Sequence, residues 1–428
     1  MGLLDDDAPS RNALGDRGDI VTLTVKEWLK FFIVGLFPWL AVNGVFAELA
    51  VFNRYMPEHK KLSSQAGMAC QIANISLVYV YLRRVYRDSF ISIRTTVWLL
   101  LFLNCVSCVA LALFWRVTNG EHSIVILLCT FTGGIVGILS IVTLYPWATS
   151  FQQPRAVSAL STGTAASSLI GSLLGLAQGA GEISQRFSPF VYMLLLSLVA
   201  LASSYCFYLL NSNRGNSHAN TMDLENTVGN HNSSIVTSLI EKPSKTEATG
   251  GCPNELTMKE LLLKIISPIF VQFLNCTLNY ALLPGIIPFL TCGHTLTFWF
   301  TLLISFSNVL GRFISTFYQN TDHLLPFLTF VMVILFALGM LLAGSGVTTK
   351  KHSVNEIFAG IGVALFAALN GYIESLVFLV PSRILERETE GSKEMALQAV
   401  GVCGQVGAFI GTLSTAGLVS GSAIFHQC

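Results

Sequence analysis

The sequence has 428 residues and is strongly apolar, since 52% of them are hydrophobic and only 11% are charged. Soluble proteins contain about 25% charged residues, so this composition predicts an all-α polytopic membrane protein. The formal net charge of +1 gives no basic surface for nucleic acid. The sequence contains no P-loop, H-E-x-x-H or G-x-S-x-G motif and no cluster of metal ligands. We therefore expect neither an enzyme nor an ATP-driven pump, and no cofactor or metal.

Hydropathy divides the chain into eleven expected membrane spans, because a helix needs about 20 apolar residues to cross a bilayer. The expected spans are 28–50, 64–84, 93–115, 123–146, 156–178, 188–210, 262–290, 296–317, 324–345, 355–380 and 396–424. They predict a cytosolic tail (1–27), a six-helix half (28–210), a linker (211–257) and a five-helix half (258–428). The linker is rich in Asn, Ser, Thr and Gly and is predicted to be a disordered cytosolic segment.

The distribution of Lys and Arg predicts the orientation of the chain in the membrane. With a cytosolic N-terminus, 18 of the 25 Lys and Arg residues, Arg312 among them, fall in cytosolic segments and seven in external ones. An odd number of spans then places the C-terminus outside. Cys292 and Cys428 both fall on the external face in this topology, which makes them candidates for a disulfide.

The first span and the seventh span both carry polar residues near their centres. Asn43 and Glu48 interrupt the first apolar run, and Asn275 and Asn279 interrupt the seventh at a spacing that puts both on one helical face. Polar groups at matching depth in two halves of a transporter favour a binding site between the halves, near the membrane midplane. We therefore expect Asn43 to face Asn275 and Asn279.

Polar side chains inside the expected spans define the predicted substrate site. Such residues usually face a bundle interior or a water-filled path, although a hydrogen bond between helices explains any single Asn or Gln equally well. Glu48 and Glu374 are predicted to be lone carboxylates with hardly any Lys or Arg at their depth. An amide-rich, charge-poor cavity suits a neutral solute that forms hydrogen bonds. The predicted substrate-binding residues are Trp39, Asn43, Glu48, Asn74, Thr164, Asn275, Asn279, Asn308, Glu374 and Gln405.

Several short segments match the pattern of a known transporter family. The first span has Trp-x-Ala-x-Asn-Gly from Trp39 followed by Glu-Leu, the seventh has Asn-x-x-x-Asn from Asn275 running into Leu-Pro, and the last has Gln-Val-Gly from Gln405. Further matches are Pro57, Glu58, Asn74, Cys292 and Asn308. This pattern resembles the eukaryotic riboflavin transporters of the solute carrier class. The chain departs from that family at Phe46, Thr164 and Glu374, where the family tends to have Trp, Gln and Lys.

The resemblance implies an eleven-helix, multi-pass carrier of the plasma membrane that takes up riboflavin without ATP. We expect such a carrier to work as a monomer in the lipid bilayer, by rocking one half against the other around the central site. The departures lie in the presumed ligand region and favour, as an alternative, a carrier of another neutral heterocycle such as a nucleoside. An alternative from a different class is a membrane receptor that binds its ligand without moving it.

Overall fold

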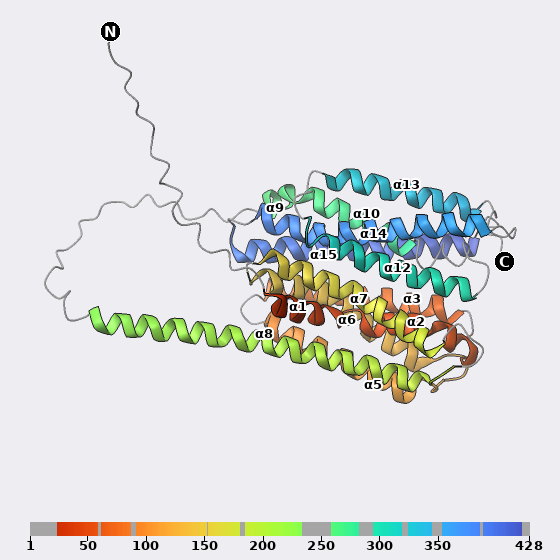
Figure 1. Ribbon diagram of the computed structural model, residues 1–428, viewed down its shortest axis with the longest axis horizontal. Helices are drawn as coiled ribbons and strands as arrows, with labels where there is room; N and C mark the ends of the chain where they lie inside the picture. Colours follow the sequence, from red (N-terminus) through yellow and green to blue (C-terminus); the bar gives the residue numbers. More distant parts are fainter. Residues whose placement is uncertain are drawn as a thin grey trace, which may run out of the picture.

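The computed structural model is a bundle of long helices (Figure 1). It describes residues 24–58, 61–86, 91–151, 153–179, 185–232, 258–281, 294–318, 324–344, 353–385 and 388–421. The first half contains α1 (Val25–Leu36), α2 (Leu40–Tyr55), α3 (Lys61–Ile72), the 3₁₀ segment η1 (Ala73–Leu77), α4 (Val78–Val85), α5 (Ile93–Phe114), α6 (Ile124–Thr149), α7 (Pro154–Gln178) and α8 (Pro189–Asn232). The second half contains α9 (Met258–Lys264), α10 (Ile266–Ala281), α12 (His294–Ile314), α13 (Leu325–Gly344), α14 (Ser353–Ile384) and α15 (Glu390–Gly421).

Several of these helices are long and apolar enough to cross a membrane, and the all-α polytopic prediction is confirmed. Six segments of the described residues satisfy both conditions: Ile93–Phe114, Ile124–Thr149, Arg155–Gln178, Pro189–Ser212, Ile357–Ile384 and Gly391–Ser414. The bent pair α1 and α2 would make a seventh, and α12 and α13 contain shorter apolar stretches. The described part of each of the eleven expected spans lies on these helices, but the count of eleven stays a prediction.

The first expected span is broken into two helices. Its chain bends by 59° between α1 and α2. Pro38 lies in this break, and a proline has no N–H to donate and collides with the preceding turn of a helix. Thr24 and Glu27 form a capping box at the start of α1, which satisfies backbone N–H groups that the first turn leaves free. The break places Trp39 at the N-terminus of α2, directly before the polar stretch of this span.

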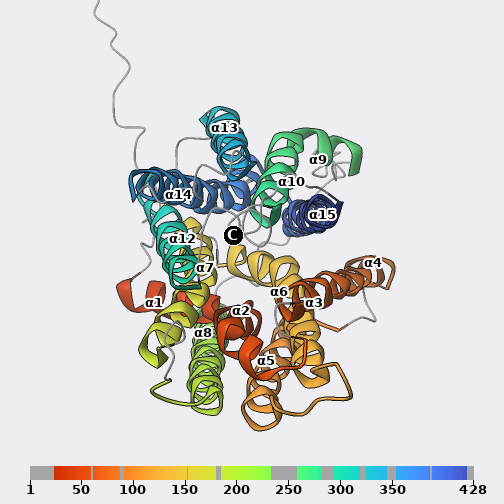
Figure 2. The same cartoon turned by 90° about the vertical axis from the view of Figure 1, so that its right-hand side faces the viewer.

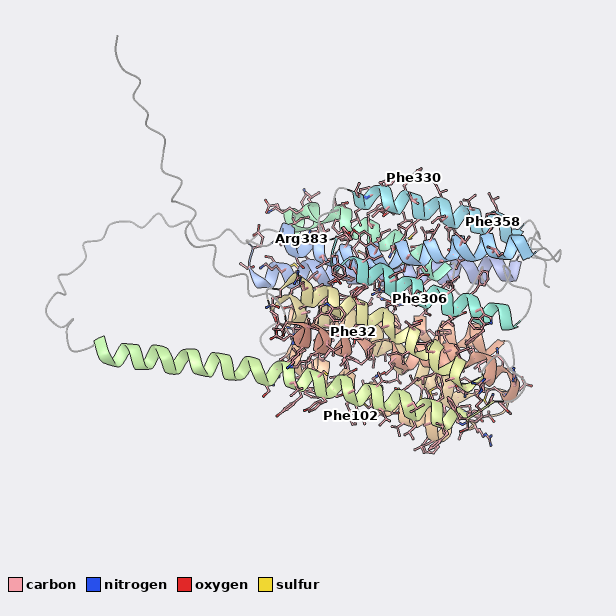
Figure 3. All side chains as sticks on the ribbon, in the orientation of Figure 1. Phe32, Phe102, Phe306, Phe330, Phe358 and Arg383 are labelled. Atoms are coloured by element: carbon pink, nitrogen blue, oxygen red, sulfur yellow. The ribbon has the colours of Figure 1, made fainter. Side chains whose placement is uncertain are left out.

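The outside of the bundle is covered with apolar side chains. Phe102, Phe306, Phe330 and Phe358 are each more than half exposed. Figure 3 shows these four rings on the outer surface of the helices, pointing away from the bundle. A soluble protein rarely exposes so many large apolar groups together, so this surface fits a lipid environment.

Helix α8 continues beyond the bundle. It extends past the expected end of its span at residue 210 and ends at Asn232, so the first part of the predicted linker is helical. Figure 1 shows this extension projecting from the end of the bundle where α1 begins. Its sequence is polar on all sides, so the extension has no apolar stripe with which to pack against other helices. The remainder of the predicted linker, residues 233–257, lies outside the described residues.

The same pattern of helix crossings occurs in both halves. In the first half, α1 packs against α7 and α3 packs against α6; in the second, α10 packs against α15 and α12 packs against α14. When the spans are numbered from the start of each half, α1 with α7 and α10 with α15 are crossings of the first span with the fifth. The pairs α3 with α6 and α12 with α14 are crossings of the second span with the fourth. Figure 2 shows the halves side by side, with α6 and α7 facing the second half. The contacts between the halves include α7 with α12 and with α14, and α6 with α15.

Two of these crossings depend on glycine. A Cβ atom added to Gly163 of α7 would collide with the backbone carbonyl of Phe32 in α1, and one added to Gly311 of α12 would collide with the carbonyl of Ala368 in α14. Small residues allow helix backbones to approach closely, which gives packing energy in lipid where no hydrophobic effect drives helices together. The close crossings hold α7, α12 and α14 in fixed positions, and these helices carry most of the candidate site.

Candidate substrate site

A chain of three asparagines links three helices of the second half. The Asn308 side chain of α12 donates from Nδ2 to Oδ1 of Asn370 in α14, at 2.7 Å. Asn370 donates in turn to Oδ1 of Asn275 in α10, at 3.1 Å. Asn275 and Asn370 are fully or almost fully buried, and buried amides are stable only when they are hydrogen-bonded. The Nδ2 atom of Asn275 is buried and has no partner among the described residues, which leaves one donor for a ligand.

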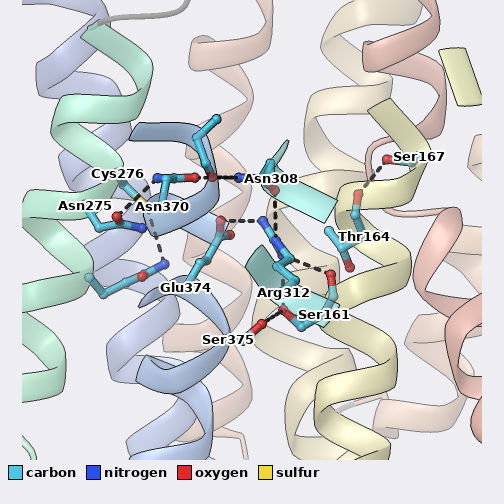
Figure 4. A network of polar contacts seen from close by, with 12 residues as sticks. Ser161, Thr164, Ser167, Asn275, Cys276, Asn308, Arg312, Asn370, Glu374 and Ser375 are labelled. Carbon is cyan, nitrogen blue, oxygen red and sulfur yellow. Dashed lines mark hydrogen bonds and ion pairs between the residues drawn. The ribbon is translucent and has the colours of Figure 1, made fainter. Parts of the chain in front are cut away.

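Arg312 of α12 extends this chain of amides toward the first half. Its Nε donates to Oδ1 of Asn308 at 3.1 Å. Its Nη1 donates to the carbonyl oxygen and the hydroxyl of Ser161 in α7, at 3.1 and 3.2 Å. Its Nη2 forms an ion pair with Oε2 of Glu374 in α14. Figure 4 shows the guanidinium between Glu374 on one side and Ser161 on the other.

Two expectations about charge are therefore wrong. Glu374 is not a lone carboxylate, because Arg312 lies at its depth and pairs with it. Arg312 does not lie in a cytosolic segment, since its side chain is only 6% exposed and is enclosed by α7, α12 and α14. A single buried charge in lipid is costly, whereas a hydrogen-bonded pair is tolerated. Moving Arg312 out of the cytosolic count leaves the predicted orientation unchanged.

Hydroxyl groups along one face of α7 bond to the second half. Ser158 contacts Thr316 at 2.7 Å, Ser161 contacts Ser375 at 2.8 Å, and Ser168 contacts Ser305 at 2.7 Å. The spacing of these serines, three and seven residues apart, puts them on one side of a helix. This row joins the two halves along most of the length of α7.

Aromatic side chains surround the ion pair. Tyr145 of α6 and Tyr280 of α10 lie within electrostatic range of both Arg312 and Glu374. Tyr145 is stacked on Phe378 of α14, with ring centroids 4.0 Å apart and planes inclined by 2°. This stack joins the halves one helical turn beyond Glu374, on the side where α1 begins.

The polar residues of the first span form a separate group inside the first half. Asn43 of α2 donates from Nδ2 to the Ser167 hydroxyl of α7 at 2.9 Å, and Ser167 donates to the Thr164 carbonyl at 2.7 Å. The expected contact of Asn43 with Asn275 and Asn279 is not among the contacts of the described residues. The side chain of Thr164 itself donates to the carbonyl of Leu160. The rotation of α2 therefore directs Asn43 toward α7 and not toward α10.

Glu48 and Trp39 also lie within the first half. Glu48 is completely buried, and the Gln178 amide of α7 is the polar group beside it. None of the ion pairs found among the described residues involves Glu48. A side chain added at Gly137 of α6 would collide with the Trp39 ring, so Trp39 packs directly on α6.

The other predicted site residues are less closely connected to the cluster. Asn74 lies in η1 and donates to the carbonyl and the side chain of Gln71, both at 3.0 Å. Asn279 is half-buried on α10, and Gln405 is buried on α15. Cys292 and Cys428 lie outside the described residues, so the disulfide stays a prediction.

Two contacts hold the ends of the bundle. At the end where α1 begins, Arg83 of α4 forms an ion pair with Glu394 of α15 at 3.0 Å, which links the two halves. At the opposite end, Glu58 follows α2 and accepts a hydrogen bond from the backbone N–H of Ser123 and another, 2.6 Å long, from its hydroxyl. Burial alone would raise the pKa of Glu58, but the hydrogen bonds from Ser123 outweigh it and lower the pKa below its usual value.

The cluster thus contains three predicted residues, Asn275, Asn308 and Glu374, and three that the site prediction missed, Asn370, Arg312 and Ser161. One sequence signal could have identified Arg312. It lies four residues after Asn308, as Glu374 lies four residues after Asn370, so each pair occupies one helical face and the two faces can meet. Ser161 has no such signal, because a serine on a small-residue helix is ambiguous.

The arrangement of helices resembles that of a solved structure. The structure of the major facilitator superfamily proton:xylose symporter XylE, bound to 6-bromo-6-deoxy-D-glucose, matches this chain with a TM-score of 0.58. The match covers 94% of this chain and 90% of that chain, at 14% sequence identity. The protein therefore shares the two-half helical fold of that structure.

Sequence comparison defines the family of this chain. The family model described as solute carrier family 52, riboflavin transporter, matches residues 26–427. The chain belongs to this family, which confirms the resemblance seen in the short segments. Riboflavin transporter member 3 of Ailuropoda melanoleuca is 32% identical over 151 residues, and that of Homo sapiens is 31% identical over 153. These alignments cover 34% and 35% of this chain and 32% of each relative, so each spans about a third of the relative's length.

Proposed function

We propose that this chain transports riboflavin across the membrane by alternating access, without ATP. Membership of the riboflavin transporter family and the major facilitator fold support this function. The observation that carries the proposal is the polar cluster centred on Arg312, which joins α7 of one half to α12 and α14 of the other. A solute bound there would contact both halves and would be exposed to alternate sides as they rock.

We assign Asn275, Asn308 and Glu374 as substrate-binding residues. Riboflavin has a flat ring system with carbonyl and imide groups and a chain of hydroxyl groups. The free Nδ2 donor of Asn275 can bond a carbonyl, and the carboxylate of Glu374 can accept from hydroxyls. Tyr280 of α10 and Tyr145 of α6 lie beside the ion pair and can supply apolar walls for the ring.

The predicted residues of α2 and α7 act from the first half in this proposal. Asn43, Thr164 and Trp39 support the wall formed by α2 and α7, while Glu48 lies deeper inside the same half. We further propose that the carrier works as a monomer in the plasma membrane, with its N-terminus in the cytosol and its C-terminus outside. In that orientation the contact of Arg83 with Glu394 and the stack of Tyr145 on Phe378 close the cytosolic side.

The test is uptake of labelled riboflavin into liposomes that contain the purified full-length protein. We expect saturable uptake that unlabelled riboflavin suppresses and that needs no nucleotide. Asn370→Leu removes the central amide of the chain and should reduce uptake about tenfold or more, since it leaves the buried Asn275 amide without its partner and removes the acceptor of Asn308. Gln398→Leu is a matched control, because Gln398 bonds Glu394 at the end of the bundle and not the cluster.

The same assay separates the alternatives. Stronger competition by nucleosides than by flavins would favour a carrier of another heterocycle. The reason for this alternative is that the chain departs from the family pattern at Phe46, Thr164 and Glu374. Binding of riboflavin without uptake would favour a receptor. Absence of both binding and uptake in folded protein would rule the proposed function out.

A further inference from the structure

The two members of the central ion pair differ in accessibility. The side chain of Glu374 is 19% exposed, whereas that of Arg312 is 6% exposed. Arg312 also directs its donors to Asn308, Ser161 and Glu374, on all sides of its guanidinium. A solute that approaches this pair therefore meets the carboxylate first, and few donors of the guanidinium are left for it.

Glu374 lies where the two halves meet. Arg312 of α12 pairs with it and also bonds Ser161 of α7, in the other half. Figure 4 shows Arg312 and Ser161 on one side of Glu374 and Asn275 and Cys276 of α10 on the other. Tyr280 of α10 and Tyr145 of α6 lie within electrostatic range of the carboxylate. The Glu374 side chain is therefore placed among groups from both halves.

We propose that Glu374, held in place by Arg312, is a charge filter that admits a neutral polyhydroxylated solute and rejects the phosphate ester of the same solute. This inference rests on the proposed transport of riboflavin and names what sets its specificity. A phosphomonoester carries a charge of about −1.5 to −2 at neutral pH. Its approach to the carboxylate is unfavourable in a site of low dielectric, and the guanidinium, which is more buried and has its donors occupied, offsets this repulsion only in part. Hydroxyl groups, in contrast, donate to the free lone pairs of the carboxylate.

The experiment compares binding of riboflavin and of riboflavin 5′-phosphate by the full-length protein in lipid nanodiscs, measured by quenching of flavin fluorescence. The quantity of interest is the dissociation constant of riboflavin 5′-phosphate divided by the dissociation constant of riboflavin. We expect the wild-type protein to bind the phosphate ester at least about tenfold more weakly than riboflavin. In Glu374→Gln the ratio should fall toward one, because the repelling charge is lost and Nη2 of Arg312 becomes free to bind phosphate.

Two further variants ensure that the conclusion does not depend on whether the single variant Glu374→Gln folds. The double variant R312Q/E374Q removes both charges and avoids a lone buried guanidinium; its ratio should also fall, but without the gain in phosphate affinity. Glu394→Gln neutralises another carboxylate paired with an arginine, in α15 and outside the cluster, and should keep the wild-type ratio.

The outcomes distinguish this inference from the proposed function. A wild-type protein that binds riboflavin and its phosphate equally overturns the charge filter and leaves riboflavin transport standing. So does a wild-type ratio that persists in both Glu374 variants while riboflavin is still bound. Folded wild-type protein that binds neither flavin overturns the proposed function and the filter with it.

Discussion

The two halves of the bundle share their helix crossings but differ in their polar interior. Both halves cross their first span with the fifth and their second with the fourth. The second half holds a connected cluster from Asn275 to Arg312 that reaches across to Ser161. The first half holds Asn43, which bonds to its own α7, and Glu48, which is buried and has no ion-pair partner within the described part of the chain. The scaffold is thus repeated, whereas the candidate binding chemistry is concentrated in the second half.

This difference bears on the mechanism. A contact inside one half can persist while the halves rock, because each half moves as a rigid body. The bond of Asn43 to Ser167 is of this kind. The bonds of Arg312 to Ser161 and of Ser168 to Ser305 cross between the halves, so some of them must break or change when the path opens. In the proposed mechanism, substrate bound at the cluster would influence that change.

The strongest test of the comparison is to remove one polar group from each half. Arg312→Gln leaves Glu374 without its cation and should destabilise the protein by about 3–5 kcal/mol, with loss of riboflavin uptake. Glu48→Gln keeps the shape of the side chain and removes no ion pair, so its effect should be less than about 1 kcal/mol. Thermal unfolding in nanodiscs measures both. Equal losses from the two variants would contradict the asymmetry between the halves.

Much of this fold could be predicted from the sequence, because long apolar runs have few alternatives to a membrane helix. The polar positions Asn275, Asn308 and Glu374 were likewise visible, since polar groups in apolar runs are rare. The depth of Arg312 was not visible. Hydropathy defines the end of a span only to within a few residues, and one turn of helix decides whether an arginine reaches the membrane surface or the bundle interior.

The partners of the site residues were also beyond the sequence. The side to which Asn43 points depends on the rotation of α2 about its axis, which the break at Pro38 sets. Pro38 marks the position of the 59° bend between α1 and α2, but the packing of α1 on α7 and of α2 on α7 and α6 also involves residues distant in the sequence. A pair of asparagines in corresponding spans therefore predicts a shared depth, which stays a prediction, but it could not establish a contact.

A second test concerns the crossings that the halves share. Gly163→Val at the first–fifth crossing of the first half and Gly407→Val at the same crossing of the second half each place a side chain against a backbone carbonyl of the neighbouring helix, that of Phe32 and that of Phe273. Both should destabilise the protein by about 1–3 kcal/mol, because the backbones must separate. Gly362→Val on α14 is the control, since nothing lies within 4 Å of a Cβ at that position. A large loss at only one of the two crossings, measured by thermal unfolding, would show that the repeat in architecture is not a repeat in energetics.

The smallest expected effect concerns the end of the first half, where Glu58 binds Ser123 at the start of α6. Because the pKa of Glu58 is lowered in the folded protein, this contact contributes stability above the usual carboxyl pKa of 4.5 and loses it as the pH falls below that value. The loss should be about 1 kcal/mol, the size of a single helix cap. It should appear as faster hydrogen exchange of the first amides of α6 below pH 4.5, with no such change across neutral pH.

Glu58→Gln should give fast exchange at every pH, because the neutral amide binds the N-terminus of α6 more weakly than a carboxylate does. Glu121→Gln changes an exposed carboxylate in the loop that contains Ser123. This variant should leave the pH dependence as in the wild type. The ion pair of Arg83 with Glu394 lies at the other end and joins the halves, so its loss should change the opening of the bundle and not the exchange of α6. If acid instead releases α6 and the contacts between the halves together, the ends of the bundle are coupled and the first half does not behave as an independent unit.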